Sequence, residues 1–248
     1  MRSYDIIAVA GQGAVDRFSK AGIDIHQNQF KKIGRPQLKK LKRAKGSTPI
    51  KTILYAPTWE SPDHLNNYSS VNKFGTDLLN FLASECPEIK VIIKLHPLTG
   101  SVDKSLIQTI ELIESQVKRL NLNQQRPKEK MYEFHGVKSN ILLSELYDKA
   151  DCLMCDISSV LGDFLYTNKL SFVFDTKKIE QSRLQSDYPT TRGSHIISSV
   201  SDFYSTMLPT FQHDSKQQER LETSKYIFED SSPNPDSKFF EMLREVSN

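Results

Sequence analysis

Short apolar runs alternate along the chain with longer amphipathic stretches. Near-continuous apolar runs are typical of strands that helices cover on both faces. Regular alternation of such strands with helices indicates an α/β fold with a doubly wound parallel sheet, which is the fold class we expect. The predicted strands are Tyr4–Ala10, Thr52–Ala56, Val91–Leu95, Met131–Phe134, Asp151–Cys155 and Ser171–Phe174.

The amphipathic stretches predict helices that pack on this sheet. The clearest of them spans Val102–Leu120, where apolar residues recur at helical spacing and would face the core. These residues are Leu106, Ile110, Ile113 and Val117. The other predicted helices are Ala14–Ala21, Val71–Ala83, Leu142–Asp148, Ser159–Thr167, Ser201–Met207 and Phe239–Val246.

The start of the chain is more basic and less apolar than the rest. Between Ile25 and Trp59 there are nine Lys or Arg residues and no acidic residue. We expect residues 1–45 to form a basic segment or linker that packs on a main domain at residues 46–248. A solvated linker face would explain this charge, and contact with an anionic membrane surface or polymer is the alternative. Nucleic acid is disfavoured, because apart from Phe30 no aromatic residue is interleaved with these basic residues.

The composition is that of an ordinary globular protein, with 38% hydrophobic and 25% charged residues and a net charge of +3. No apolar run approaches the roughly 20 residues that a membrane helix needs. The first residues also lack the layout of a signal peptide. We therefore expect a cytoplasmic location, with peripheral contact at the inner face of the membrane if the basic segment binds lipid.

The three cysteines do not indicate a redox or metal site. Cys152 and Cys155 lie inside an apolar run, whereas a reactive pair needs an exposed helix start. No second pair completes a zinc site, and no Asp-x-Asp motif is present. We expect buried thiols and no essential metal.

Polar and aromatic residues follow two predicted strands, at the sheet edge where open parallel sheets bind ligands. Pro57 ends one strand, so Thr58 and Trp59 lie in the loop above it, where Trp59 can cover a base or a ribose or simply pack. Pro97 fixes His96 at the end of the next strand. An imidazole there can donate a hydrogen bond to a phosphate or pass a proton.

A third predicted strand leads into Asp156 and a pair of serines. Ser158 and Ser159 come at the start of the following helix, where one of them should be the N-cap or lie in the first turn. Free N–H groups and two hydroxyls would form a cradle for a diphosphate. An ordinary serine cap is the alternative interpretation.

Several segments, in this order and spacing, resemble the CDP-glycerol glycerophosphotransferases, the teichoic-acid-type polymerases and primases of bacterial walls and capsules. The resemblance implies that the chain is the Rossmann-like donor-binding lobe of a two-lobed glycosyltransferase-B fold. The segments are Ile33–Pro36, Tyr55–Trp59, Lys94–Pro97, Asp156–Phe164 and Tyr188–Gly193.

The resemblance also implies an activity and roles for residues. A CDP-linked donor, CDP-glycerol or a similar one, would pass a polyol phosphate to a hydroxyl of a polyol-phosphate or glycolipid acceptor. Ser158 and Ser159 would hold the donor phosphates, and His96 would bind the diphosphate or assist transfer as the catalytic residue. No cofactor is implied. The remaining residues expected at the substrate are Thr58, Trp59, Pro97, Asp156 and Lys238, the last in place of an arginine of the family.

Besides Lys238, two further departures from the family pattern leave alternatives open. Ile157 stands where the family has a tyrosine, and the family's N-terminal lobe, with its acceptor site and base, has no counterpart here. We therefore expect a chain that binds the donor but needs a missing lobe or a partner chain. The alternatives are a glycosyltransferase that uses a sugar nucleotide, and a nucleotide-binding fragment that is inactive alone.

Overall fold

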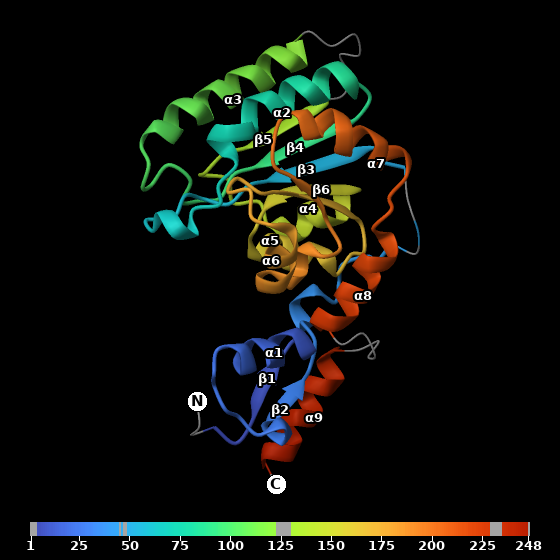
Figure 1. The fold of residues 1–248 in the computed structure, drawn as a ribbon. Coiled ribbons are helices and arrows are strands. Elements are labelled where there is room, and N and C mark those ends of the chain that lie inside the picture. Colours follow the sequence, from blue (N-terminus) through green and yellow to red (C-terminus); the bar gives the residue numbers. More distant parts are fainter. Residues whose placement is uncertain (1–3, 45, 47–48, 123–129, 229–234, 248) are drawn as a thin grey trace.

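The computed structural model describes residues 4–44, 46, 49–122, 130–228 and 235–247. Six parallel strands form one sheet in the upper part of the molecule (Figure 1). They are β3 (Thr52–Ala56), β4 (Lys90–Lys94), β5 (Tyr132–His135), β6 (Cys152–Asp156), β7 (Leu170–Phe174) and β8 (His195–Ile197).

The order of the strands is β5-β4-β3-β6-β7-β8, so the winding reverses between β3 and β6. This is the order of doubly wound nucleotide-binding folds, and it confirms the predicted fold class. In the register, Tyr55 of β3 lies beside Ile93 on one side and Met154 on the other. The loops that follow β3, β4 and β6 therefore meet at one edge, at the point of reversal.

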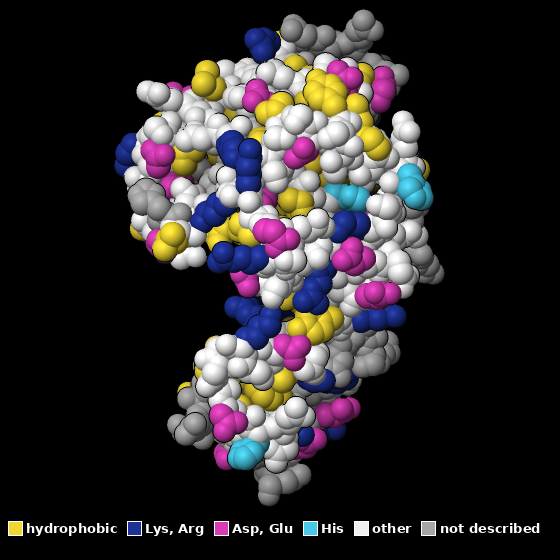
Figure 2. Space-filling model, in the orientation of Figure 1, with side chains coloured by type: hydrophobic (Ala, Val, Ile, Leu, Met, Phe, Trp, Pro, Cys, Tyr) yellow, Lys and Arg dark blue, Asp and Glu magenta, His cyan; other side chains and the backbone are white. Residues whose placement is uncertain are grey.

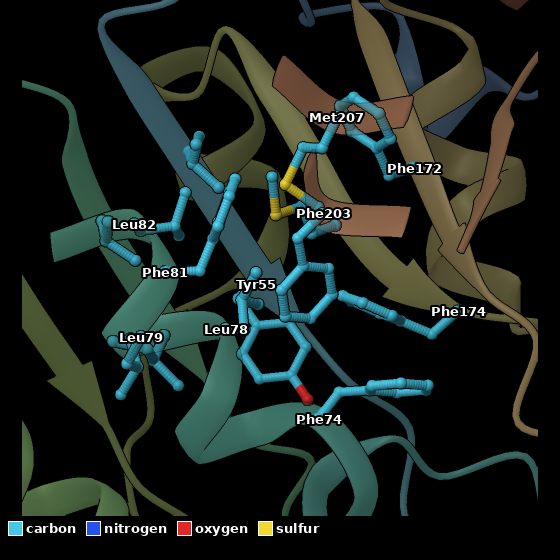
Figure 3. Close-up of a cluster of buried hydrophobic side chains, with 14 of the residues drawn as sticks. Tyr55, Phe74, Leu78, Leu79, Phe81, Leu82, Phe172, Phe174, Phe203 and Met207 are labelled. Carbon is cyan, nitrogen blue, oxygen red and sulfur yellow. The ribbon is translucent and has the colours of Figure 1, made fainter. Parts of the chain in front are cut away.

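Helices cover both faces of this sheet and separate the core into two layers. The layer that holds Tyr55 also contains Phe74, Phe174 and Phe203, whose rings contact one another (Figure 3). The helices of this part are α2 (Val71–Glu85), α3 (Ser105–Leu122), α4 (Leu143–Lys149), α5 (Ser159–Leu165), α6 (Gln181–Asp187), α7 (Leu208–Gln212) and α8 (Gln217–Phe228).

Two predictions about the core are confirmed. The apolar stripe of α3 faces inward, with Leu106, Ile113 and Val117 buried and Ile110 partly buried. Cys152 and Cys155 are free and buried, on opposite faces of β6, and burial raises the pKa of both thiols.

A smaller unit lies below the sheet (Figure 1). Its strands β1 (Ile7–Val9) and β2 (Phe30–Lys32) form a separate two-stranded parallel sheet, with α1 (Gln12–Lys20) and α9 (Pro235–Ser247) beside it. Lys31 of β2 forms an ion pair with Glu245 of α9, at 2.5 Å. The basic segment therefore has a sheet and a helix of its own, and the boundary near residue 45 stays a prediction.

Polar contacts join the smaller unit to the larger one, and two of them are short. The Tyr226 hydroxyl of α8 donates to Asp16 of α1, at 2.6 Å. Arg35 forms an ion pair with Asp163 of α5, at 2.5 Å. Short helical turns complete the fold: 3-10 turns at Gln27–Gln29, Pro36–Leu38, His64–Asn66 and Pro189–Thr191, and a π-helix at Phe203–Met207.

The hydrophobic pattern does not predict β2, β8, α6 or α8. Helix α8 has no apolar stripe, because several of its buried side chains are polar, among them Arg220, Thr223 and Ser224. A helix does form at the predicted residues 201–207, but it is a π-helix from Phe203 to Met207 and continues into α7, which the pattern does not predict. Among the described residues, none of the helices combines the length and the hydropathy needed to cross a bilayer.

The buried guanidinium of Arg220 explains how a polar helix face packs. It donates to both carboxylate oxygens of Asp214, at 2.7 and 3.1 Å, and to the Gly193 carbonyl at 3.0 Å. A ring nitrogen of His195 lies 3.0 Å from the same carboxylate. Burial alone would raise the pKa of Asp214, but the hydrogen bonds from His195 and Arg220 outweigh it and lower the pKa.

Replacing Arg220 with alanine should lower the free energy of unfolding by about 3–5 kcal/mol, because the buried Asp214 carboxylate would lose its bidentate cation and keep only His195 and the Lys216 N–H. Denaturant unfolding measures this change. The control is K225A, which removes an exposed cation from the same helix. A loss for R220A no larger than that for K225A would contradict this account of α8.

Candidate functional site

A cavity of about 220 Å³ lies at the carboxyl ends of β3, β4 and β6, where the winding of the sheet reverses. Its wall comes from the loops after β3 and β4 and from the first residues of α4 and α5. It is lined by Ala56, Pro57, Thr58, Trp59, Lys94, Leu95, His96, Pro97, Leu143, Ser158, Ser159 and Val160.

Most residues expected at the substrate lie on this wall. The cavity brings Thr58 and Trp59 together with His96 and Pro97. Ser158 and Ser159, at the start of α5, line the same cavity. Asp156 is fully buried and does not line the cavity. Lys238 lies on α9, beside β1 and β2 in the smaller unit, and does not line it either (Figure 1). A contact between Lys238 and the donor stays a prediction.

Asp156 ties the loop after β3 to the end of β6. Its Oδ2 accepts from the backbone N–H of Thr58 at 2.7 Å and of Ser70 at 3.2 Å. Within the described residues, Oδ1 has no hydrogen-bond partner. Burial raises the pKa of the carboxyl to about 7, although the hydrogen bonds oppose the shift. The Asp156 side chain therefore fixes the loop after β3, which forms part of the cavity wall.

Glu60 holds the loop after β4 against the loop after β3. The buried carboxylate accepts from the backbone N–H of Gly100 at 3.0 Å, of Val102 at 2.9 Å and of Asp103 at 3.1 Å. Burial alone would raise the pKa of Glu60, but these backbone donors outweigh it and lower the pKa. Three bonds from one loop to one side chain fix the distance between the two walls.

Trp59 and His96 face each other across these walls. Their rings are stacked, with centroids 5.9 Å apart and planes 18° apart. His96 Nδ1 accepts a hydrogen bond from the Leu98 N–H at 3.1 Å, so the neutral ring carries its proton on Nε2. Burial and the nearby Lys94 ammonium lower the pKa of His96, and Glu60 acts in the opposite direction. The neutral ring is a hydrogen-bond donor, and it lies on the cavity wall.

Lys94 is a site residue that the sequence analysis did not single out. It is the last residue of β4, 5% exposed, and its ammonium donates to the Leu95 carbonyl at 2.9 Å. Burial lowers its pKa. Within the described residues no carboxylate pairs with it. A buried cation without a counter-ion on a cavity wall is poised to bind an anion.

Ser158 is the N-cap residue of α5, as the sequence indicates for one of the two serines. Its hydroxyl makes no capping bond and is buried without a hydrogen-bond partner among the described residues. Ser159 begins the helix and is exposed. An unpartnered buried hydroxyl on the wall can donate to a bound oxyanion. In the described part of the chain, no group of three His, Cys, Asp or Glu side chains could hold a metal ion.

Comparison with protein families gives one match. The model of the CDP-Glycerol:Poly(glycerophosphate) glycerophosphotransferase family covers residues 2–230. The chain belongs to this family. No curated protein matches the chain.

Solved structures of this glycerophosphotransferase fold include the wall teichoic acid polymerase TagF. It is 14% identical, with a TM-score of 0.55 over 98% of this chain and 59% of that chain. A TagF variant soaked with CDPG is 17% identical, with a TM-score of 0.54 over 98% and 58%. The α,α-trehalose 6-phosphate synthase from Burkholderia multivorans is 12% identical, with a TM-score of 0.53 over 100% and 59%.

These likenesses show the fold alone, which is one lobe of the two-lobed glycosyltransferase-B architecture. The chain spans only 58–59% of the length of these structures.

Replacing Asp156 with asparagine should change how stability depends on pH. The pKa of the carboxyl is about 7 in the folded chain, against about 3.9 for a free aspartate. Between these values the folded state binds more protons, so stability falls as pH rises, by up to about 1.4 kcal/mol per pH unit. Asparagine keeps an acceptor for both N–H groups but does not titrate, so D156N should lack this slope.

Denaturant unfolding of both proteins at intervals from about pH 4 to about pH 8 measures the difference. The stability of D156N relative to the wild type should increase as the pH rises from about 4 and level off above about 7. Parallel curves would mean that Asp156 titrates in the folded chain as it does in the unfolded one.

Proposed function

We propose that this chain supplies the donor-binding lobe of a glycerophosphotransferase that uses CDP-glycerol or a similar CDP-linked polyol. The observation that carries the proposal is the buried ammonium of Lys94 on the cavity wall, without a carboxylate partner among the described residues. The Ser158 hydroxyl and the Nε2–H of His96 add neutral donors on the same wall. One cation with neutral donors suits a diphosphate.

The size of the cavity limits what it holds. Sites for whole drug-sized ligands usually measure roughly 300–1,000 Å³, and this cavity measures about 220 Å³. It therefore holds the diphosphate and its nearest groups, while the rest of the nucleotide extends along the edge of the sheet. Trp59 is the only tryptophan of the chain and reports binding by its fluorescence.

In the proposed reaction, an acceptor hydroxyl attacks the phosphorus next to the glycerol, and the bond to the bridging oxygen of CMP breaks in line with the attack. The hydroxyl proton goes to a base, and CMP leaves with the electron pair of the broken bond. Lys94 and the Nε2–H of His96 would offset the charge that develops on the phosphate oxygens. Catalysis on this lobe is positioning and charge stabilisation.

His96 would act as a donor and not as the base. A base at Nε2 needs the proton on Nδ1, but Nδ1 already accepts from the Leu98 N–H. Two N–H groups would then face each other at 3.1 Å, which the half-buried ring cannot tolerate without moving. The acceptor proton therefore goes to a group outside this cavity. This supports the proposal that a further lobe or partner chain completes the enzyme.

A sugar nucleotide is the alternative donor, because the fold is shared with trehalose 6-phosphate synthase. The family match favours the glycerol donor over this alternative. Calorimetry with CDP-glycerol, a CDP-sugar and a UDP-sugar separates the two, since only the first should bind in the proposed function. If the chain binds nucleotide but no transfer occurs when a further lobe is supplied, the chain is a nucleotide-binding fragment that is inactive alone.

Replacing Lys94 with methionine should weaken CDP-glycerol binding by roughly 1.5–3 kcal/mol, because one charge-assisted hydrogen bond to the diphosphate is lost. Stability should stay unchanged or rise, because a buried charge is removed. Titration followed by calorimetry or Trp59 fluorescence measures affinity, and denaturant unfolding measures stability.

The control is K149M, which removes an exposed cation from α4. Equal affinity of K94M and K149M for CDP-glycerol would remove Lys94 from the donor site. A large loss of stability in K94M would instead give this lysine a structural role.

A further inference from the structure

A second cavity, of about 420 Å³, lies between the loop that follows β3 and the segment that leads from β7 into α6. It is at the same carboxyl edge of the sheet as the donor cavity. One loop, residues 57–70, separates the two, because Thr58 lines the first and Tyr68 lines the second. A ligand can therefore reach from one cavity toward the other along a single edge.

Cations predominate at the second cavity. Three cations, Lys177, Lys178 and Arg183, line it with two acidic residues, Glu180 and Asp187, and Asp187 is paired with Arg183. Glu180 accepts from the backbone N–H groups at the start of α6, and Asp187 lies 3.4 Å from the Arg183 guanidinium. Figure 2 shows Lys and Arg side chains gathered along the notch between the two units, which α6 borders in Figure 1. This distribution favours an anionic ligand.

The turn that carries Lys178 is held in a strained conformation. Lys178 has a φ of 55°, in the left-handed region where a lysine is uncommon. The buried carboxylate of Asp175 holds this turn by accepting from the N–H of Lys177 at 3.0 Å and of Ile179 at 2.6 Å. The fold thus maintains a strained backbone that places an exposed ammonium at the cavity.

Hydroxyl groups form another part of the wall. The hydroxyls of Tyr68 and Tyr188 hydrogen-bond to each other at 2.5 Å. Burial and the neighbouring Tyr188 raise the pKa of Tyr68 to about 12, so it stays a neutral hydroxyl. One proton lies between the two oxygens, and the other remains to bond a ligand hydroxyl or phosphate oxygen.

The cavity is poorly suited to a nucleobase. The ammonium of Lys177 lies 4.1 Å from the centre of the Tyr68 ring. It therefore occupies a face of this ring on which a base would otherwise stack. The Tyr188 ring meets Tyr68 edge to face. The cavity thus offers cations and a pair of hydroxyls, while the Tyr68 face beside Lys177 is closed to stacking. This combination matches phosphates separated by short polyols.

We propose that this second cavity binds the phosphodiester-linked polyol chain that accepts the transferred unit. The proposal rests on the proposed function, because it takes the donor to lie in the neighbouring cavity. A chain held between the β3 loop and α6 would approach the donor along the shared edge of the sheet. The cavity would hold one or a few internal repeats, and the terminal hydroxyl would lie outside it, at the acceptor site of the proposed further lobe.

The test uses the double variant K178Q/R183Q, which removes two exposed charges. The matched control is R119Q/K149Q, which removes the same two residue types from exposed positions on α3 and α4. The ligands are a short synthetic glycerol-phosphate oligomer, a pyrimidine oligodeoxynucleotide of the same charge, and CDP-glycerol. Calorimetry at one fixed ionic strength measures each affinity.

The double variant should bind the glycerol-phosphate oligomer at least tenfold more weakly than the wild type, and the control should change less than twofold. The wild type should bind the oligodeoxynucleotide much more weakly than the oligomer, and CDP-glycerol should bind equally to all three proteins. Equal loss in both variants, or equal affinity for the two polyanions, would overturn the proposal. Failure of the wild type to bind CDP-glycerol, with oligomer binding intact, would count against the proposed donor site alone.

Discussion

Two buried carboxylates hold the loop after β3, and the arrangement of the site depends on them. Asp156 accepts from the backbone at the start of this loop and at the start of α2. Glu60 accepts from three backbone N–H groups of the loop after β4. Since the bonds run to backbone, they fix the course of both loops. The stacked pair of Trp59 and His96 is thereby preorganised before any ligand binds.

The hydrophobic pattern predicts the parallel sheet and most of the cavity because both depend on local features. Apolar runs mark the central strands, and β3 spans the residues expected for it, ending where Pro57 follows. Proline and polar residues after a strand mark the carboxyl edge. The wall formed by Thr58, His96 and Ser158 could be predicted from such signals alone.

The residues that the sequence does not reveal act through distant partners. Glu60 bonds to backbone groups about 40 positions later, and its importance appears only when the two loops meet. Lys94 ends an apolar strand, where its side chain could equally have reached solvent. The inward face of α8 cannot be recognised from the sequence, because it carries Arg220, whose charge is neutralised by Asp214 before the helix. Strand β2 is short and basic, so its pairing with β1 leaves no hydrophobic signal.

The chemistry follows from how these buried groups are paired. The carboxylates of Asp156 and Glu60 accept hydrogen bonds from loop backbone and do not line the cavity. The cavity wall therefore carries an ammonium, a neutral imidazole and a hydroxyl but, among the described residues, no carboxylate. Such a wall attracts a diphosphate but offers no base. The proposed donor role and the proposed further lobe therefore rest on the same observation, a wall whose described residues include donors and no carboxylate.

The most direct test of the account is a crystal structure of this chain soaked with CDP-glycerol. The account predicts that the diphosphate lies within hydrogen-bond distance of Lys94 Nζ, His96 Nε2 and Ser158 Oγ, and that Leu98 still donates to His96 Nδ1. A diphosphate bound elsewhere, with the Lys94 ammonium still bonded only to the Leu95 carbonyl, would contradict it.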